Sequence, residues 1–145
     1  MRKMKVTEII LVDTAFWIAW LDPRDQHHLE ARNKDEWLED ARIMIPWPIV
    51  YETVRTRLVR RPDRVLSFDR LLKKAQVFFV DDSDFRADAY DLAVEYAVHR
   101  KRSISMVDML CRLLIEDVNT RVDAVLTTNP EDFRDVCERE GVIIL

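Results

Sequence analysis

Glycine is almost absent from this sequence of 145 residues, in which Gly141 is the only one. Loops that wrap a nucleotide phosphate need several glycines within a few residues, because only glycine lets the backbone approach the phosphate so closely. The sequence therefore excludes the P-loop and the glycine-rich dinucleotide fingerprint. If this protein handles phosphate groups, it does so by other means.

Cysteine is scarce as well, because Cys111 and Cys137 are the only two and no C-x-x-C pair occurs. This pattern excludes a disulfide framework, a zinc ribbon and a thioredoxin-type redox motif. Two isolated thiols suit a reducing compartment, so we expect a cytoplasmic protein.

Long apolar runs are also missing. No uncharged segment approaches the length of a membrane span, and Glu8 and Asp13 interrupt the apolar residues that follow the basic stretch 2–5. A membrane helix needs about 20 consecutive apolar residues, and a secretory signal needs an uninterrupted apolar core. We therefore expect no membrane association.

The chain does have a hydrophobic content of 48% and a net charge of −4. This content is enough for one hydrophobic core, so we expect a single domain over residues 1–145. The overall charge repels nucleic acid, so a polyanionic partner would have to be met by a local basic patch or by a metal ion.

Short apolar runs alternate with helical patterns along the whole chain. This alternation predicts a three-layer α/β/α sandwich with a mostly parallel central sheet. The helical patterns place Leu29, Val54 and Val118 among the core-facing residues. The predicted strands are 9–12, 41–45, 77–80, 122–126 and 142–145. The predicted helices are 14–21, 27–40, 48–60, 63–75, 85–99, 105–118 and 131–140.

Asp13 directly follows the first predicted strand, which is apolar throughout and suits the centre of a parallel sheet. In such sheets, ligands bind at the carboxyl ends of the strands. Asp13 also has a purely local interpretation, as the N-cap of the helix that begins at Thr14. The choice between the two depends on whether other acidic residues reach the same edge.

Three further polar residues are expected at that edge. Glu52 lies in the first turns of the helix after the second strand, Asp108 in the first turn of the helix that Ser105 opens, and Asn129 at the end of the fourth strand. Asp132, three residues later, belongs to the start of the following helix. Carboxylates that gather at one point repel each other unless they are protonated or bridged by a cation. A set of oxygen ligands without cysteine or histidine suits Mg²⁺ or Mn²⁺.

Each of these acids also has a local interpretation. Ser105-x-x-Asp108 matches a helix capping box, in which Asp108 would hold a backbone N–H. Glu52 could pair with neighbours on its own helix face, and Asp132 could favour a helix N-terminus electrostatically.

The order and spacing of these motifs resemble the PIN-domain nucleases, and within them the VapC-type toxins, over nearly the whole chain. The chain departs from the family at Ala15, where the family often has Asn or Ser, and at Asn129, where many members have Asp. The fourth carboxylate is therefore either absent or supplied by Asp132. The motifs are Val12-Asp13-Thr14, Pro48-x-x-x-Glu52, Ser105-x-x-Asp108 and the run 127–133, Thr-Thr-Asn-Pro-Glu-Asp-Phe.

This resemblance implies a Mg²⁺- or Mn²⁺-dependent endoribonuclease in which a metal-activated water attacks an RNA phosphodiester bond. It further implies a small antitoxin protein as partner, and we expect a homodimer. The catalytic residues would be Asp13, Glu52 and Asp108, and the metal ligands the same three with Asp132. The residues expected to support them are Thr14, Thr127, Thr128 and Asn129; for the two strand-end threonines, plain β propensity is an alternative explanation.

Arginine is concentrated in one stretch that begins three residues after Glu52. Guanidinium groups match phosphates well, so this stretch is the candidate for RNA binding, with Arg55 and Arg57 nearest to the acids. A solvated face paired with nearby acids, or a surface for an acidic partner, would explain it equally. Its members are Arg55, Arg57, Arg60, Arg61 and Arg64.

Two other functional classes compete with the nuclease. A non-catalytic PIN-like module that binds RNA or protein is favoured if Asn129 marks a decayed metal site. A phosphatase of the haloacid-dehalogenase type or a receiver domain also places Asp at a strand end. The phosphatase needs a second Asp where this chain has Ala15, and the receiver domain needs a late strand-end Lys that this chain lacks.

Overall fold

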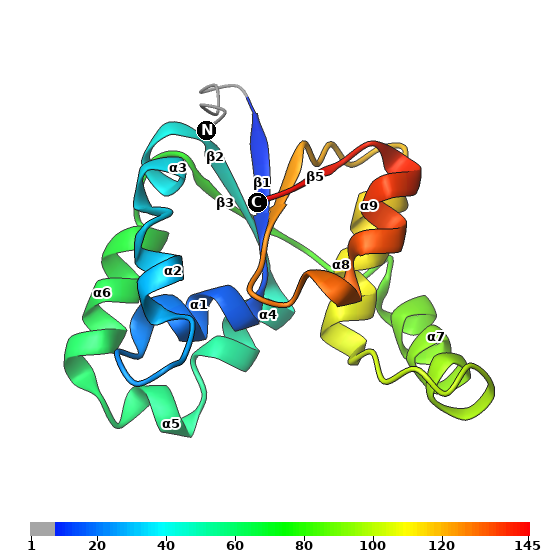
Figure 1. Cartoon of the computed structure of the whole chain (residues 1–145), viewed down its shortest axis with the longest axis horizontal. Helices are drawn as coiled ribbons and strands as arrows, with labels where there is room; N and C mark the ends of the chain where they lie inside the picture. Colours follow the sequence, from blue (N-terminus) through cyan, green and yellow to red (C-terminus); the bar gives the residue numbers. More distant parts are fainter. Residues whose placement is uncertain (1–7) are drawn as a thin grey trace.

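The computed structural model describes residues 8–145 and is built around one parallel sheet with strand order β3-β2-β1-β4-β5 (Figure 1). The basic stretch 2–5 lies outside the described residues. Every strand pair is parallel, as the alternation of strands and helices predicts. The strands are β1 (Ile9–Val12), β2 (Arg42–Pro46), β3 (Val77–Val80), β4 (Ala124–Leu126) and β5 (Ile143–Ile144).

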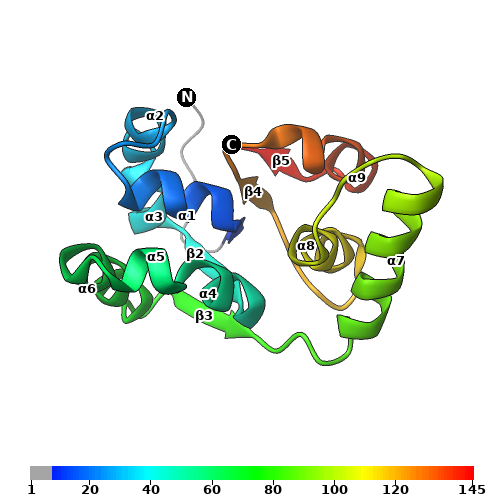
Figure 2. The same cartoon turned by 90° about the horizontal axis from the view of Figure 1, so that it is seen from below.

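Helices cover the sheet on both sides, which confirms the predicted three-layer sandwich (Figures 1 and 2). In residues 8–145, no helix combines the length and apolar character that crossing a membrane requires. One layer contains α1 (Thr14–Leu21), α2 (His28–Arg32), α3 (Asp35–Asp40), α4 (Trp47–Thr53), α5 (Thr56–Val59) and α6 (Pro62–Leu72). The other contains α7 (Arg86–His99), α8 (Met106–Glu116) and α9 (Arg134–Glu140), with the short 3₁₀ helix η1 (Pro130–Asp132) before α9.

Strand β1 is at the centre of the sheet because it is apolar on both faces. All four of its residues are buried, and Ile10 pairs with Ile43 of β2 on one side and Ala124 of β4 on the other. Helix α1 follows without a loop and packs Trp17 edge-on against Phe68 of α6, with 5.3 Å between the ring centroids. The carboxyl end of β1 is therefore fixed between two strands and a buried helix.

Helix α7 stands apart from the main core. It packs mainly against α8, through a small separate cluster that includes Ala89, Met109 and Leu114. Of its residues only Ala89 is fully buried, and Tyr90, Val94 and Val98 are exposed. Helix α8 thus lies between the sheet and α7, which fixes the N-terminal turn that carries Asp108.

Two long helices predicted from the sequence are each broken in the structure. The segment 27–40 forms α2 and α3, separated by a turn at Asn33 and Lys34, and asparagine favours such turns. The Nε1 of Trp20 donates to Asp35 at the start of α3, at 2.5 Å. The segment 48–60 forms α4 and α5, because Val54 leaves the helical conformation and Arg55 is extended.

Three residues predicted to face the core are exposed instead. Leu29 is 78% exposed, because the break after α2 changes which face of that helix packs inward. Val54 is 36% exposed at the break between α4 and α5, and Val118 is 94% exposed in the turn beyond the end of α8. In each case a helix ends or turns earlier than the periodicity of apolar residues indicates.

Candidate active site

Asp13 at the carboxyl end of β1 is the buried centre of the candidate site, with only 3% of its surface exposed. Its Oδ1 accepts a hydrogen bond from the backbone N–H of Phe16 at 2.9 Å, which confirms that it caps α1. Its Oδ2 accepts a second hydrogen bond, from the hydroxyl of Thr127 at 2.5 Å. Capping therefore uses only one of the two carboxylate oxygens.

Thr127 reaches Asp13 because β1 and β4 are neighbours in the sheet. Val12 and Leu126 are register partners, so the next residue of each strand emerges at the same edge. The backbone N–H of Asp13 also donates to the carbonyl of Leu126, at 3.3 Å. The hydroxyl of Thr127 in turn accepts a hydrogen bond from the backbone N–H of Asn129 at 2.9 Å, which fixes its direction.

Asp108 lies in the first turn of α8, where Ser105 is the N-cap. The hydroxyl of Ser105 accepts the backbone N–H of Asp108 at 3.1 Å, so Ser105 caps the helix, but no hydrogen bond among residues 8–145 joins the Asp108 carboxylate to a backbone N–H. The carboxyl group of Asp108 nevertheless senses the other acids. Burial, and then the charges of Asp13, Asp132 and Glu52, raise the pKa of Asp108 to about 7.

The pKa of Asp13 is also high, at about 6. Burial is the main cause, and the charges of Asp132 and Glu52 raise it further, whereas the hydrogen bonds from Thr127 and Phe16 lower it. The structure thus brings Glu52 and Asp132 close enough for their charges to raise the pKa values of Asp13 and Asp108. Glu52 contributes from α4, directly beyond the end of β2.

Asp132 is held in place by Asn129. The side-chain amide of Asn129 donates to Asp132 Oδ2 at 2.8 Å, so the residue that replaces the family's usual acid positions the acid three residues later. The charge of Asp132 raises the pKa of both Asp13 and Asp108. Asp132 therefore lies near Asp13 and Asp108, and the hydrogen bond from Asn129 holds its carboxylate there.

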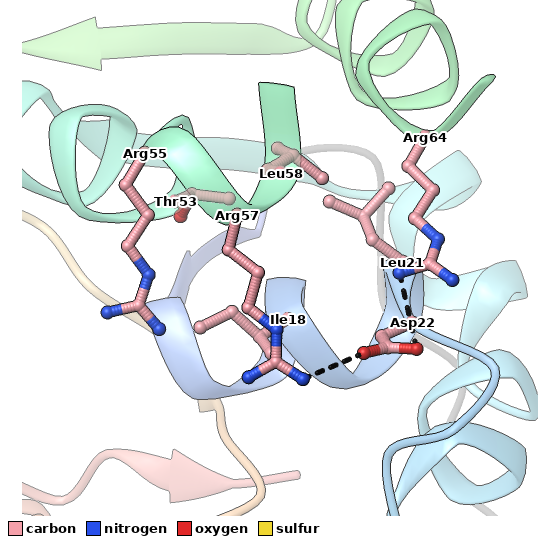
Figure 3. Close-up of a pocket in the computed structure, with 8 residues that line it drawn as sticks. All are labelled: Ile18, Leu21, Asp22, Thr53, Arg55, Arg57, Leu58 and Arg64. Carbon is pink, nitrogen blue, oxygen red and sulfur yellow. Dashed lines mark ion pairs between the residues drawn. The ribbon is translucent and has the colours of Figure 1, made fainter. Parts of the chain in front are cut away.

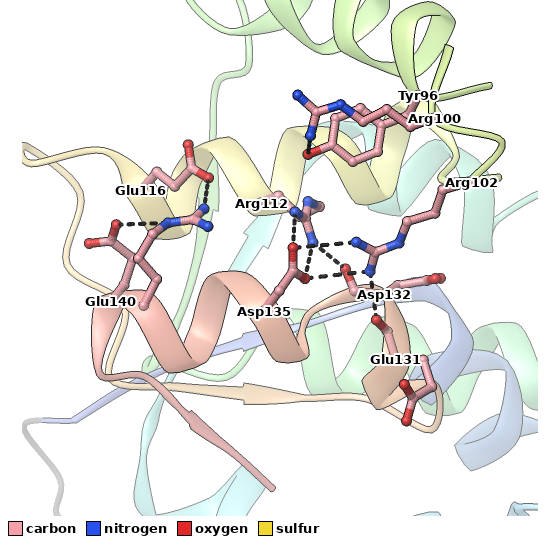
Figure 4. A network of polar contacts seen from close by, with 10 residues as sticks. Tyr96, Arg100, Arg102, Arg112, Glu116, Glu131, Asp132, Asp135 and Glu140 are labelled. Carbon is pink, nitrogen blue, oxygen red and sulfur yellow. Dashed lines mark hydrogen bonds and ion pairs between the residues drawn. The ribbon is translucent and has the colours of Figure 1, made fainter. Parts of the chain in front are cut away.

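A buried arginine on α8 anchors the segment that carries Asp132 (Figure 4). The guanidinium of Arg112, 3% exposed, donates to both oxygens of Asp135 at 2.8 Å and to the backbone carbonyl of Asp132 at 2.8 Å. Arg102 donates to the carbonyl of Glu131 at 2.8 Å and also contacts Asp135. These bonds hold η1 and the start of α9 against α8.

Thr14 and Thr128 form no hydrogen bond to the four acids among the described residues. Thr14 is buried, and within residues 8–145 its hydroxyl has no hydrogen-bond partner. Thr128 is half-buried, and no hydrogen bond of the described part of the chain joins it to the four acids. Their expected supporting roles stay predictions.

The arginine stretch begins three residues after Glu52 and is only partly neutralised (Figure 3). Arg57 and Arg64 form ion pairs with Asp22 at 3.7 and 3.3 Å. Arg55, two residues beyond the end of α4, is exposed and forms no ion pair among the described residues. Pairing with a nearby acid therefore accounts for Arg57 and Arg64 but not for Arg55.

The acids offer only oxygen donors. In residues 8–145, no three carboxylate, imidazole or thiol groups surround one point closely enough to hold a cation by themselves. Mg²⁺ commonly takes one or two carboxylates and completes its shell with water and substrate phosphate oxygens. The donor set fits that mode of binding, and each hydrogen-bonded oxygen of Asp13 keeps a second lone pair for it.

The sequence model of the PIN domain family matches residues 10–139, a range that includes all four acids. The chain belongs to the PIN domain family. No curated protein matches it in sequence.

Two solved structures share this PIN fold over most of their length. One is the VapC20 toxin of Mycobacterium tuberculosis, described as cleaving the sarcin–ricin loop. It is 20% identical to this chain in sequence and superposes with a TM-score of 0.67, and the match covers 87% of this chain and 94% of VapC20. The other is VapBC2 of Rickettsia felis, bound to a DNA fragment from its promoter. It is 12% identical to this chain and superposes with a TM-score of 0.59, and the match covers 94% of this chain and 97% of the VapBC2 chain. They confirm the fold inferred from the sequence.

The sequence did not point to the anchoring role of Arg112 in this PIN domain. The available clue is a charged residue inside the helix 105–118, next to the buried Cys111 and one turn from Asp108. An arginine in that position must find an acidic partner if it is buried. Finding Asp135 as that partner requires the packing of α9 against α8.

Proposed function

We propose that this chain is a Mg²⁺- or Mn²⁺-dependent endoribonuclease. The observation that carries the proposal is a pair of buried carboxyl groups, those of Asp13 and Asp108, on which the charges of Glu52 and Asp132 also act and whose pKa values are raised to about 6 and 7. Perturbed acids in one place are typical of catalytic and metal sites. Membership of the PIN domain family and the fold shared with a sarcin–ricin-loop-cleaving toxin support the same function.

The chain's own residues would prepare the site for the ion. Asp13 and Asp108 would hold it directly, and Glu52 and Asp132 directly or through water. Thr127 and the Phe16 N–H keep the Asp13 carboxylate fixed, so it need not reorganise when a ligand arrives. When bound, such an ion activates water as the nucleophile and offsets the charge of the attacked phosphate. Arg55 and Arg57 would hold the RNA backbone.

The direct experiment is cleavage of a mixed RNA pool by the purified chain in the presence of Mg²⁺ or Mn²⁺. We expect Asp13→Asn to abolish cleavage, because it removes a charge at the centre of the acids. Asp91→Asn is the matched control, since Asp91 is exposed on α7 away from these residues. Equal cleavage by the wild type and Asp13→Asn would refute the assignment of Asp13.

The alternative function is a non-catalytic PIN-like module that binds RNA or protein. It rests on Asn129, which stands where many members of the family have Asp. The contact between Asn129 and Asp132 weakens this alternative, because a carboxylate is supplied by the neighbouring residue. A chain that binds RNA but cuts none of it with either metal would favour the binding module.

We further propose that the chain is the toxin of a toxin–antitoxin pair, acts in the cytoplasm and forms a homodimer. The fold it shares with VapC20 and VapBC2 supports the first point. The two free, buried cysteines suit a reducing compartment. A small neighbouring open reading frame whose product co-purifies with this chain and inhibits cleavage would support the pairing, and light scattering would measure the mass of the assembly.

A further inference from the structure

A pocket that opens to solvent lies between α1, α4, α5 and α6, and encloses about 370 Å³ of space with its mouth included (Figure 3). Its apolar side is formed by Ile18, Leu21 and Leu58. Its polar residues are Asp22, Thr53, Arg55, Arg57 and Arg64. This combination of an apolar floor with a few polar groups is typical of a ligand site.

The Thr53 hydroxyl is the most informative group of the pocket. Thr53 is only 2% exposed, and in residues 8–145 its Oγ1 has no hydrogen-bond partner. Buried polar atoms in native proteins are nearly always hydrogen-bonded. An unpartnered hydroxyl on the wall of a pocket therefore indicates a ligand that supplies the missing donor or acceptor.

The pocket is positively charged although the protein as a whole is negative. Three arginines line it against one carboxylate, that of Asp22, in a chain of net charge −4. Asp22 holds the guanidinium groups of Arg57 and Arg64 in place, and Arg55 extends beside them without an ion pair among the described residues. Fixed and free guanidinium groups together favour an anionic ligand with a flat face.

The pocket adjoins Glu52 and lies along the helix that Asp13 caps. Thr53 directly follows Glu52 in α4, and α1 begins directly after Asp13. Ile18 is five residues from Asp13, which corresponds to about 7.5 Å along the helix. A strand bound at the acids would therefore pass the pocket with a neighbouring nucleotide.

We propose that this pocket binds the base of an unpaired nucleotide next to the cleaved phosphate, a proposal that rests on the function proposed above. The base lies on Ile18 and Leu58, and its edge hydrogen-bonds the Thr53 hydroxyl. Arg55 stacks on the exposed face or binds the flanking phosphate, as arginine does in single-stranded RNA recognition. The pocket would then select which RNA sequence is cut.

An acidic segment of a partner protein is the competing occupant. The position beside Glu52 favours RNA, because the substrate must pass this point whatever else the protein binds. The lone buried hydroxyl also suits a base edge, which offers single donors and acceptors in the plane of an apolar ring.

The test measures RNA binding without divalent cations, so that cleavage plays no part. Fluorescent single-stranded octamers of each base, and versions of the tightest one with an abasic residue at each position, are titrated with the full chain in EDTA. We expect one abasic position to weaken binding about 10-fold. We expect Thr53→Val, which keeps the side-chain shape, to weaken binding of the intact octamer about 3- to 10-fold and to leave the abasic one unchanged.

A matched control separates the pocket from folding. Thr56→Val makes the same change at an exposed residue outside the pocket. Thr53→Val removes an unpartnered buried hydroxyl, so the variant should fold at least as stably as the wild type. Equal RNA affinity of Thr53→Val and Thr56→Val would overturn the proposal.

The remaining outcomes distinguish this proposal from the proposed function. If Thr53→Val and every abasic position leave RNA cleavage unchanged, the pocket proposal is wrong and the nuclease proposal stands. If RNA binding depends on the abasic position but no RNA is cleaved in Mg²⁺ or Mn²⁺, the pocket proposal stands and the nuclease proposal is wrong. If Thr53→Val weakens only the binding of an acidic amphipathic peptide, the pocket belongs to a protein partner and the proposal is wrong.

Discussion

The hydroxyl of Thr127 donates to the carboxylate of Asp13 at 2.5 Å, across 114 positions of sequence and between two neighbouring strands. This bond stabilises the charged form of a carboxyl group that burial would otherwise keep protonated. It also fixes the carboxylate, whose other oxygen caps α1. The same acid therefore serves the fold and the proposed site through different oxygens.

Replacing Thr127 by Val should raise the pKa of Asp13 above about 6, because the hydrogen bond that lowers it is lost. We expect the acid limb of the pH–rate profile of RNA cleavage to move up by about one pH unit, as the loss of a hydrogen bond to a charged group implies. Thr127→Ser keeps the hydroxyl and should restore the profile. An unshifted profile in Thr127→Val would show that Asp13 does not limit the rate.

The metal-free protein should lose stability as the pH rises from about 4 to 7. In this range the folded chain keeps protons on Asp13 and Asp108 that the unfolded chain has already released, because the folded pKa values are about 6 and 7 against 3.8. The free energy of unfolding therefore falls with pH, by about 3 kcal/mol for Asp13 acting alone. Thermal unfolding in EDTA at pH 5 and pH 8 measures the difference.

Adding Mg²⁺ or Mn²⁺ should raise the melting temperature more at pH 8 than at pH 5. The ion binds deprotonated carboxylates, and Asp13 and Asp108 are both mostly deprotonated only above about pH 7. Binding to the folded state alone stabilises it. Ca²⁺ in the same assay tests whether the effect follows any hard divalent cation. Equal shifts at the two pH values would contradict a site at these acids.

Asp108→Asn should abolish cleavage and stabilise the metal-free protein at pH 8. The substitution removes one of the charges that repel one another around Asp13, and it keeps the size of the side chain. We expect a gain of about 1–3 kcal/mol, which corresponds to a few degrees in melting temperature. Asp91→Asn on α7 should leave both properties unchanged. A destabilised Asp108→Asn would mean that the carboxylate is needed for folding.

Arg112→Met should destabilise the protein by about 1–3 kcal/mol, because it removes the ion pair of a buried arginine with the half-exposed Asp135 and leaves the backbone carbonyl of Asp132 without its donor. Arg139→Met is the matched control, since Arg139 also joins α9 to α8, through Glu116, but is exposed. We expect that control to cost less than about 1 kcal/mol. Urea unfolding of both variants gives the comparison, and equal losses would contradict the anchoring role.

Asn129→Asp should place a second carboxylate against Asp132, where the amide now donates at 2.8 Å. The repulsion should lower metal-free stability, and the added charge should strengthen divalent-cation binding. Thermal unfolding with increasing Mn²⁺ measures both effects, with Asn129→Ala as the control that only removes the donor. If Asn129→Asp and Asn129→Ala bind Mn²⁺ alike, position 129 does not reach the site.

The sequence by itself determined the sheet and the acids. The run 9–12 is apolar on both faces, so it can only be a central strand, and Asp13 must then emerge at the carboxyl edge of the sheet. Asp108 follows from the cap at Ser105, because a helix that starts there holds its first turn at the same edge. The positions of these residues at the sheet edge follow from the local sequence pattern and from the order of strands and helices along the chain.

Only the tertiary structure decided where helices break and which polar groups meet. Helices α2 and α4, which end at the breaks after Arg32 and Thr53, both pack on α1, whereas the apolar periodicity ran through both breaks. The bond from Thr127 lowers the pKa of Asp13, and the bonds from Asn129 to Asp132 and from Arg112 to Asp135 fix the position of the segment that carries Asp132. Such contacts depend on distances between side chains from separate elements, and spacing along the chain does not contain that information.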